Sequence, residues 1–268
     1  METTSRPPRW IKPQLTRLVE DAPQGSDWLH EIKYDGYRMH ARIDGGNIQL
    51  LTRTGLDWSH RYKRTIEALR SLRVKSAYLD GELCALNADG VPVFSRLQAA
   101  MDEGRTDQLV FFAFDLLFLN GQSTAQLPLI ERKERLRQLF KKEIQGLQYN
   151  EHVTGDGPRF REHACKLGLE GVISKRADRP YAPGDRGIWV KSKCLNREEF
   201  VVVGWTDPEG AGGTSAPCCW VTTPKITPIS IICSPHNTFT SQLLHEHLAT
   251  KIVPFNANGT DDTRNLRE

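Results

Sequence analysis

Apolar and polar residues alternate along much of the chain up to Gly213, and this pattern predicts a protein rich in strands. Alternation over residues 28–34, 37–43 and 47–53 predicts three half-buried strands. Asp-Gly turns at residues 35–36 and 44–46 would separate them. Further strands are predicted at residues 77–86, 109–118, 171–175, 187–193 and 199–205. Residues 109–118 are mostly apolar, which predicts a strand buried on both faces.

Apolar residues at helical spacing predict helices between these strands. They run over residues 59–72, with Ser59 as the N-terminal cap, and over residues 94–102 and 129–142. Short elements of undefined type follow at residues 147–153 and 159–168. Mixed strands and helices without strict β-α-β alternation predict an α+β fold with antiparallel sheets.

Composition changes sharply after Gly213. Up to that glycine more than a quarter of the residues are Asp, Glu, Lys or Arg, whereas from Thr214 on only about one in seven is. The segment from Thr214 also holds three of the six cysteines, and it shows little periodicity apart from a pattern for a short helix at residues 241–249. We therefore consider residues 1–213 and 214–268 separately and expect the second region to be poorly ordered.

The bulk numbers exclude few classes of function. A net charge of +3 allows a polyanionic partner without requiring one. No apolar run approaches the length of a membrane span, and the N-terminus has no apolar leader segment, so we expect no membrane association. Six cysteines without a CxxC pair favour a reduced, cytosolic compartment.

Lys33 is the first candidate for chemistry. It stands at the end of the first predicted strand, just before Asp35-Gly36. Partial burial beside other cations would favour its neutral amine, which is a nucleophile. The alternative is an ordinary strand-end lysine with its ammonium group in water, and a lone Lys-x-Asp-Gly favours that alternative.

Charged groups elsewhere could serve such a nucleophile. Arg38 lies just across the turn, and Arg53 ends the third strand; each could bind phosphate, although a solvated arginine fits either position. Glu82 and Glu170 each belong to a short apolar strand, where carboxylates are rare unless paired or bound to a cation. Glu82 could reach a ribose or a metal, and Glu170 could hold Mg²⁺.

Aromatic and basic residues complete the predicted set. Phe114 could stack on a purine base, although core packing explains it equally well. Lys191 and Lys193 share one face of a strand, which suits phosphate binding or a solvated sheet edge. Together these groups predict attack of Lys33 on the α-phosphate of a nucleotide, with cations stabilising the charge of the transferred group.

The order and spacing of these segments resemble the ATP-dependent DNA ligases of the covalent nucleotidyltransferase superfamily, and most closely the ligase domain of bacterial DNA ligase D. The resemblance covers about residues 9–213. It rests on the segments WLHEIKYDGYR at residues 28–38, LTRTGLDW at 51–58, LDGE at 79–82, FAFDLL at 112–117, LEGVISKR at 169–176 and WVKSKC at 189–194. It implies a lead-in over residues 1–26, an adenylation domain over 27–197 and an OB-fold beginning at 198.

The resemblance also implies a role for each candidate near the nucleotide. Lys33 would carry AMP through a phosphoramidate bond. Glu31 would lie near the adenine amino group, and Phe114 would stack on the base. Glu82 would contact the ribose, with metal binding as a second interpretation, and Glu170 would bind the metal.

The remaining implications concern phosphates, cofactors and partners. Arg38 and Arg53 would serve the phosphates and the substrate end, and Lys191 and Lys193 the α-phosphate. ATP and Mg²⁺ or Mn²⁺ would be the cofactors, and nicked or broken duplex DNA the substrate. A Ku-like end-binding protein is the implied partner of a monomeric enzyme in the bacterial cytoplasm, associated with the nucleoid.

The sequence departs from the family pattern at the composition break. Residues 216–224 (APCCWVTTP) are what a one-base shift produces from codons for the leucine- and tyrosine-rich OB strands expected there. We therefore predict a frame shift between about Glu209 and Gly213, with residues 198–213 as the start of the OB-fold. Because the family's motif VI lies in the OB domain, we expect weak lysine adenylation and poor sealing.

Two alternative functions remain open at this stage. One is an RNA ligase or an RNA-capping guanylyltransferase, which differs in the nucleotide attached to Lys33. The other is a truncated module that binds nucleotide or DNA ends without catalysis. In that case the wild-type protein and Lys33→Ala would behave alike.

Overall fold

The computed structural model describes residues 6–184, 187–194, 201–206, 218–222 and 229–232. The chain divides into two compact units, Met1–Leu195 and Asn196–Glu268. Within the described residues, no helix is both long and apolar enough to cross a membrane.

The first unit is built from two β-sheets and the helices that cover them. Its strands are β1 (Arg17–Leu18), β2 (Gln24–Ile32), β3 (Tyr37–Asp44), β4 (Asn47–Thr52), β5 (Ser76–Cys84), β6 (Val110–Leu119), β7 (Gln122–Ser123), β8 (Leu147–Tyr149), β9 (His152–Asp156), β10 (Gly171–Arg176) and β11 (Trp189–Lys193). Its helices are α1 (Lys63–Arg70), α2 (Phe94–Asp102), α3 (Leu129–Leu139) and α4 (Gly157–Lys166), with 3₁₀ turns η1 (Ser59–Arg61) and η2 (Thr106–Gln108).

A six-stranded sheet forms one layer, in the order β4-β3-β5-β6-β7, with β8 paired to β6. β6 is buried along almost its whole length, because α3 packs on it and the core fills its other face. Phe111, Leu116 and Leu79 lie in this core with Tyr62 and Leu69 from the α1 region. Burial of this apolar surface is the main force holding the layer together.

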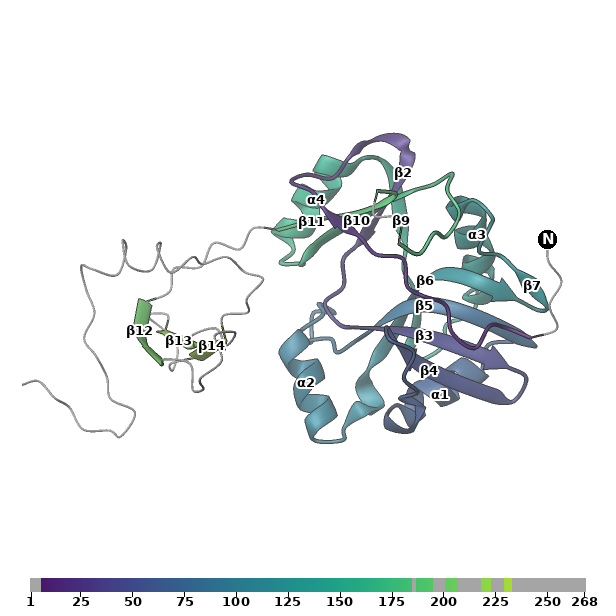
Figure 1. Cartoon of the computed structure of the whole chain (residues 1–268), viewed down its shortest axis with the longest axis horizontal. Helices are drawn as coiled ribbons and strands as arrows, with labels where there is room; N and C mark the ends of the chain where they lie inside the picture. Colours follow the sequence, from purple (N-terminus) through teal and green to yellow (C-terminus); the bar gives the residue numbers. More distant parts are fainter. Residues whose placement is uncertain (1–5, 185–186, 195–200, 207–217, 223–228, 233–268) are drawn as a thin grey trace, which may run out of the picture. The chain divides into compact units, whose positions relative to one another are not determined.

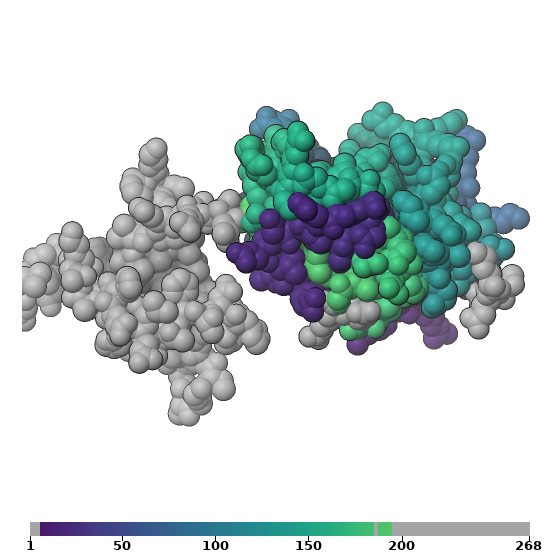
Figure 2. Space-filling view, turned by 90° about the horizontal axis from the view of Figure 1, so that it is seen from above, coloured from purple at the N-terminus to yellow at the C-terminus, as the bar shows by residue number. Residues whose placement is uncertain are grey.

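The second sheet has five strands, in the order β1-β11-β10-β2-β9. Figure 1 shows β2, β9, β10 and β11 gathered apart from the layer formed by β3 to β6. The sheet joins segments far apart in the chain: Arg17 of β1 pairs in parallel with Val190 of β11. Figure 2 shows the purple N-terminal segment lying against the green segment that leads into β11.

The predicted α+β fold and most predicted elements agree with the structure. The helix at 94–102 has the same bounds as α2, and β6 is buried on both faces as predicted. The undefined elements become β8, β9 and α4. The two sheets are mainly antiparallel, as predicted, and only the pairs β1–β11 and β6–β8 within them are parallel.

Ser59 is not the cap of a helix, so that prediction is wrong. The chain first forms η1, and α1 begins at Lys63 with no side-chain cap. The Ser59 hydroxyl instead accepts a hydrogen bond from the backbone N–H of Leu50, at 2.9 Å. A local hydrogen bond to β4 therefore competes with the capping role. The helix predicted at residues 129–142 is also shorter than expected, since α3 ends at Leu139.

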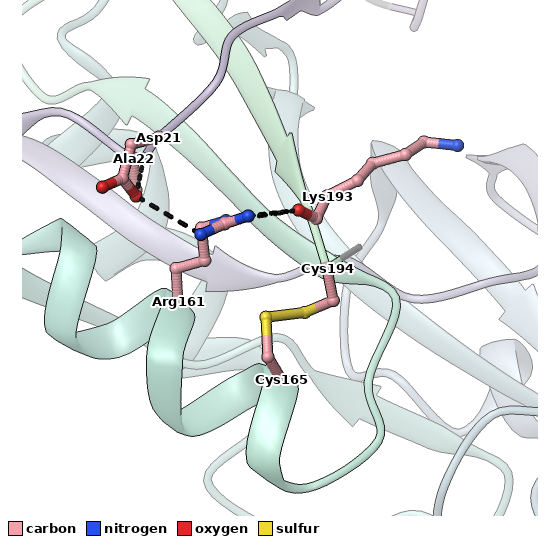
Figure 3. Close-up of a disulfide and its surroundings, with 6 residues drawn as sticks. All are labelled: Asp21, Ala22, Arg161, Cys165, Lys193 and Cys194. Carbon is pink, nitrogen blue, oxygen red and sulfur yellow. Dashed lines mark hydrogen bonds and ion pairs between the residues drawn. A yellow bond between two sulfur atoms is a disulfide. The ribbon is translucent and has the colours of Figure 1, made fainter. Parts of the chain in front are cut away.

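Cys165 and Cys194 form a disulfide, which corrects the expectation that these cysteines are reduced. They are 29 residues apart and come together because the end of α4 lies beside the end of β11 (Figure 3). Next to them, Arg161 donates a hydrogen bond to the backbone carbonyl of Lys193 at 2.7 Å. Cys84 is free and buried. Sequence spacing alone could not find a bridge that depends on tertiary packing.

The second unit contains β12 (Val201–Thr206), β13 (Cys218–Thr222) and β14 (Ile229–Ile232). They form an antiparallel sheet in the order β12-β13-β14. β12 overlaps the strand predicted at residues 199–205. β13 and β14 lie beyond the composition break, where the sequence pattern predicted no strand. The helix pattern at residues 241–249 lies outside the described residues.

Candidate active site

Strand register gathers several charged residues on one face of the five-stranded sheet. Glu31 on β2 lies opposite Ile173 on β10, and Ile173 lies opposite Lys191 on β11. At the next position on the same face of β10, Lys175 lies opposite Trp189. Because side chains alternate between the faces of a sheet, all of these point to the same side.

A cavity of about 650 Å³ opens on this face and reaches the six-stranded sheet. Its wall includes seven of the predicted site residues, namely Glu31, Lys33, Arg38, Arg53, Glu82, Phe114 and Lys191. The other two, Glu170 and Lys193, reach the cavity through Lys33 and each other. The structure therefore brings all nine predicted residues into one region, although they come from six separate segments of the chain.

Lys33 lies just beyond the end of β2, and its side chain is 19% exposed. Its backbone N–H donates to the carbonyl of Gly171 at 2.9 Å, which fixes this segment beside β10. Its amine contacts the carboxylate of Glu170. The other oxygen of Glu170 lies 3.3 Å from the amine of Lys193. One carboxylate is thus shared by two lysines at the cavity.

Two glycines allow this close approach of the chain segments. A Cβ on Gly36 would lie 2.3 Å from the carbonyl oxygen of Leu83. Gly171 has φ +150°, and a Cβ there would lie 2.3 Å from the carbonyl oxygen of Ser192. Any side chain at either position would push Lys33 or Glu170 away from its neighbours.

Arg38 on β3 is fixed by Asp80 on β5. Its guanidinium donates to both carboxylate oxygens of Asp80, at 3.0 and 2.7 Å. Burial alone would lower the pKa of Arg38, but the charge of Asp80 raises it above the ordinary value. In turn, burial would raise the pKa of Asp80, whereas Arg38 and His40 hold it well below its usual range. Arg38 is therefore a permanent, oriented cation in the cavity wall.

Glu82 lies directly opposite Arg38 across the β3–β5 pair. Burial raises the pKa of Glu82 to about 8, and the nearby charges of Arg38 and Lys33 only partly oppose this. At neutral pH this carboxyl group is mostly protonated, so it can donate a hydrogen bond as well as accept one. Such a group suits a hydroxyl better than a phosphate.

Phe114 presents a ring to the cavity and is 8% exposed. It meets Trp189 edge to face, with ring centroids 6.1 Å apart. The amine of Lys175 lies 4.3 Å from the centroid of each of these rings. This corner of the cavity is therefore aromatic and cationic at once.

Glu31 is buried and surrounded by donors. Lys133 of α3 lies 2.8 Å from one carboxylate oxygen, and Lys175 lies 2.7 Å from the other. The side-chain amide of Asn150 also donates to Glu31, at 3.1 Å. Burial lowers the pKa of Lys133, with Lys175 acting in the same direction and Glu31 against it.

Arg53 and Lys191 differ in their surroundings. Arg53 lies in the turn after β4, where its side chain is exposed at the rim of the cavity. Lys191 lies in the wall, where burial lowers its pKa, followed by the charges of Lys193 and Lys33. Lys193 itself is about half exposed. The cavity thus has one lysine whose charged form is disfavoured by burial, and cations with freer access to solvent.

Sequence reasoning missed Lys175, Asn150 and Lys133. Lys175 follows Ile173 at the alternating positions of β10, so its face was readable once the strand was known. Lys133 occupies the buried stripe of α3 beside Arg132, between Leu129 and Leu136. Charged residues at such positions signal buried partners.

The carboxylates near Lys33 could bind a metal ion only in an open site that a substrate helps to complete. Among the described residues, no group of three or more His, Cys, Asp or Glu side chains forms a metal cage. The side chain of Glu170 is 24% exposed and offers hard oxygen ligands. Mg²⁺ commonly takes one or two carboxylates together with substrate phosphates and waters. Glu170 fits that mode and does not fit a closed protein site, whereas Glu82, mostly protonated at neutral pH, is the weaker of the two predicted metal ligands.

The sequence is similar to those of known proteins. The multifunctional non-homologous end joining protein LigD of Pseudomonas aeruginosa is 41% identical over 205 residues, which cover 76% of this chain and 24% of that protein. LigD of Mycolicibacterium smegmatis is 35% identical over 194 residues, covering 72% of this chain and 24% of that protein. The chain therefore spans about a quarter of the length of these curated relatives.

Solved structures show the same fold. A mycobacterial DNA ligase D complexed with ATP and MES matches with a TM-score of 0.64 and 33% identity, covering 79% of this chain and 67% of that chain. The ligase domain of M. tuberculosis LigD matches with a TM-score of 0.62 and 31% identity, covering 93% and 83%. The family model described as ATP dependent DNA ligase domain matches residues 13–193, about two thirds of the chain. The chain belongs to the ATP-dependent DNA ligase domain family.

Proposed function

We propose that this chain binds ATP in the 650 Å³ cavity and transfers AMP to Lys33 as the first step of DNA end sealing. The observation that carries the proposal is the position of the Lys33 amine. It lies at the cavity beside the carboxylate of Glu170, with Lys191 and Lys193 close by. The positively charged wall of the cavity would attract a polyanionic nucleotide, and the Lys33 amine lies where its phosphates would be bound.

The reaction requires a neutral amine. Glu170, which contacts the Lys33 ammonium group, is placed to accept its proton, directly or through water. The nitrogen lone pair then attacks the α-phosphorus of ATP and forms the N–P bond. The bond from the α-phosphorus to the bridging oxygen breaks, and its electron pair leaves with pyrophosphate. The product is lysyl-AMP.

Other wall residues would bind the nucleotide. Phe114 supplies a ring for the base, and Glu31 a carboxylate near its exocyclic amine. Glu82, mostly protonated at neutral pH, can hydrogen-bond a ribose hydroxyl. Lys191 and Lys193 would neutralise the α-phosphate as it gains charge.

Arg38 and Arg53 would act at the phosphates and the DNA end. Arg38 is pre-oriented by Asp80, whereas Arg53 is exposed at the rim. Glu170 would hold Mg²⁺ or Mn²⁺, which when bound neutralises phosphate charge and favours departure of pyrophosphate. Glu82 could join it as a ligand only after losing its proton.

The later steps would use nicked or broken duplex DNA. AMP would move from Lys33 to a 5′-phosphate, and a 3′-hydroxyl would displace it to form the phosphodiester. The relatives named for non-homologous end joining support a role in double-strand-break repair in a bacterium. The proposal adds a monomeric enzyme in the cytoplasm, at the nucleoid, with a Ku-like end-binding protein as partner. Because residues 214–268 do not carry the family's OB pattern, we expect adenylation to be slow and sealing inefficient.

Labelling of the protein tests the first step. The full chain is incubated with ATP labelled on the α-phosphate and with Mg²⁺, and protein-bound label is followed for hours. We expect acid-labile label on the wild type and none on Lys33→Ala. Lys75→Ala, which removes an exposed lysine outside the cavity, is the matched control and should be labelled like the wild type. Equal labelling of the wild type and Lys33→Ala would refute the assignment of Lys33.

A second candidate is a module that binds nucleotide without transferring AMP. The loss of charged composition after residue 213 favours it, because the adenylation chemistry of the family depends on the following domain. ATP binding by calorimetry with no covalent label on any variant would support this candidate. Label from GTP in preference to ATP would instead support a capping-type enzyme.

A further inference from the structure

Helix α3 carries two neighbouring charged residues that are both completely buried. Arg132 and Lys133 each have 0% of their surface exposed. Arg132 reaches Asp115 on β6 of the six-stranded sheet, with its Nε and one terminal nitrogen both 2.8 Å from the carboxylate. Lys133 reaches Glu31 on β2 of the five-stranded sheet. One helix therefore contacts both sheets through adjacent side chains.

The contacts of Lys133 converge on two groups of the cavity wall. Its amine lies 2.8 Å from Oε1 of Glu31 and donates to the backbone carbonyl of Asn150 at 2.6 Å. It also lies 4.3 Å from the centroid of the Tyr149 ring. Glu31 and Asn150 line the cavity, whereas Lys133 is behind them and does not. Lys133 therefore does not touch a ligand itself and would act on it by holding these two residues.

The groups around Glu31 leave one of its oxygens open to a ligand. Lys175 and the Asn150 amide both donate to Oε2, at 2.7 and 3.1 Å. Lys133 forms an ion pair with Oε1, and that buried oxygen has no hydrogen-bond partner. Oε1 can therefore accept a hydrogen bond from a nucleobase, and its direction is set by where these three groups hold the carboxylate.

We propose that Lys133 is a positioning residue for nucleobase selection, which fixes Glu31 and Asn150 at the end of the cavity. This inference rests on the proposed function, in which Glu31 faces the exocyclic amine of adenine. A fixed acceptor there attracts the amino group of adenine. It repels guanine, which presents a carbonyl oxygen at the corresponding position. Without Lys133, the carboxylate can turn, and its preference for one base weakens.

Equilibrium binding of ATP and GTP tests this role without requiring turnover. Affinities are measured by calorimetry on the full chain for the wild type, Lys133→Met and Arg132→Met. We expect Lys133→Met to lose about tenfold in ATP affinity, corresponding to about 1.4 kcal/mol, with GTP affinity nearly unchanged. Arg132→Met removes an equally buried cation from the same helix, and its folded fraction should keep the wild-type ratio of ATP to GTP affinity.

A double-mutant cycle separates positioning from a purely structural effect. If Lys133 acts through Glu31, adding Lys133→Met to Glu31→Gln should cause no further change in the ATP to GTP ratio. Lys133→Gln, which keeps a donor in a smaller and neutral group, serves as the second variant in case Lys133→Met does not fold. Its ratio should fall between those of the wild type and Glu31→Gln.

The outcomes distinguish this inference from the proposed function. Wild-type selectivity in folded Lys133→Met and Lys133→Gln would overturn the positioning role while leaving ATP binding intact. A lower ratio in Arg132→Met equal to that of Lys133→Met would also overturn it, because any buried cation of α3 would then have the same effect. A wild-type chain that binds neither nucleotide would refute the proposed function, and the inference with it.

Discussion

The two sheets of the first unit handle buried charge in different ways. In the six-stranded sheet, Asp80 and Asp115 are each matched by an arginine that contacts both carboxylate oxygens. Around the five-stranded sheet, the carboxylates are shared: Glu31 has two lysines and Glu170 has another two. A balanced pair leaves no net charge in its layer and is costly to break, whereas an excess of cations leaves positive charge for a polyanionic ligand.

The largest effect should come from breaking a balanced pair. Arg132→Met leaves Asp115 buried without its cation, which typically costs about 3–5 kcal/mol of unfolding free energy. Urea unfolding followed by circular dichroism measures this. Arg137→Met, an exposed position on the same helix, should change stability by less than about 0.5 kcal/mol. Similar losses in the two variants would contradict the distinction between the sheets.

Removal of the disulfide should have the next largest effect. A bridge that closes a loop of 29 residues is expected to contribute about 3–4 kcal/mol by restricting the unfolded chain. The double variant Cys165→Ser with Cys194→Ser should therefore unfold at lower urea than the oxidised wild type. Treatment with reductant should lower wild-type stability to the level of the variant and leave the variant unchanged. If reductant also lowered the stability of the variant, the loss in the wild type could not be assigned to this disulfide.

Glu82 is a buried carboxyl group of the six-stranded sheet whose raised pKa should make stability depend on pH. Its pKa is about 8 in the folded protein against 4.5 ordinarily, so between these values the folded state keeps a proton that the unfolded state has released. The stability contributed by that proton is complete below pH 4.5 and is lost as pH rises through 8. Glu82→Gln should therefore gain stability relative to the wild type across this window. Glu143→Gln, at an exposed position, should follow the wild-type curve.

The smallest effect on stability is expected at Lys191. Because burial lowers its pKa, its charged form is disfavoured in the folded protein, and this cost disappears as pH rises toward 10.5. Lys191→Met should change stability at neutral pH by less than about 1 kcal/mol while weakening ATP binding about tenfold. Calorimetric titration measures the affinity, with Lys75→Met as the control. An unchanged affinity of Lys191→Met for ATP would show that Lys191 does not bind the phosphates.

Alternation and Asp-Gly turns located most of the long strands, because both are local properties of the sequence. The nine candidate residues lie at or beside one cavity, but their roles stay predictions. Glu170 and Lys33 could be selected from local sequence, but their contact depends on the pairing of β2 with β10, which lie far apart in the chain. Lys133 was overlooked although its spacing from Leu129 and Leu136 places it on the buried face of α3, because so charged a helix suggests a solvated lysine. Its partner, Glu31, belongs to β2, which no spacing rule connects to α3.

The disulfide has a consequence for the integrity of the polypeptide. Cys165 and Cys194 enclose the whole of β10 and β11 in a covalent ring. A protease that cuts once between Arg176 and Trp189 would therefore open the ring without releasing a fragment. The nicked chain would migrate as one species on a non-reducing gel and separate into two only after reduction. The strands that carry Lys175 and Lys191 would stay tethered after such a cut.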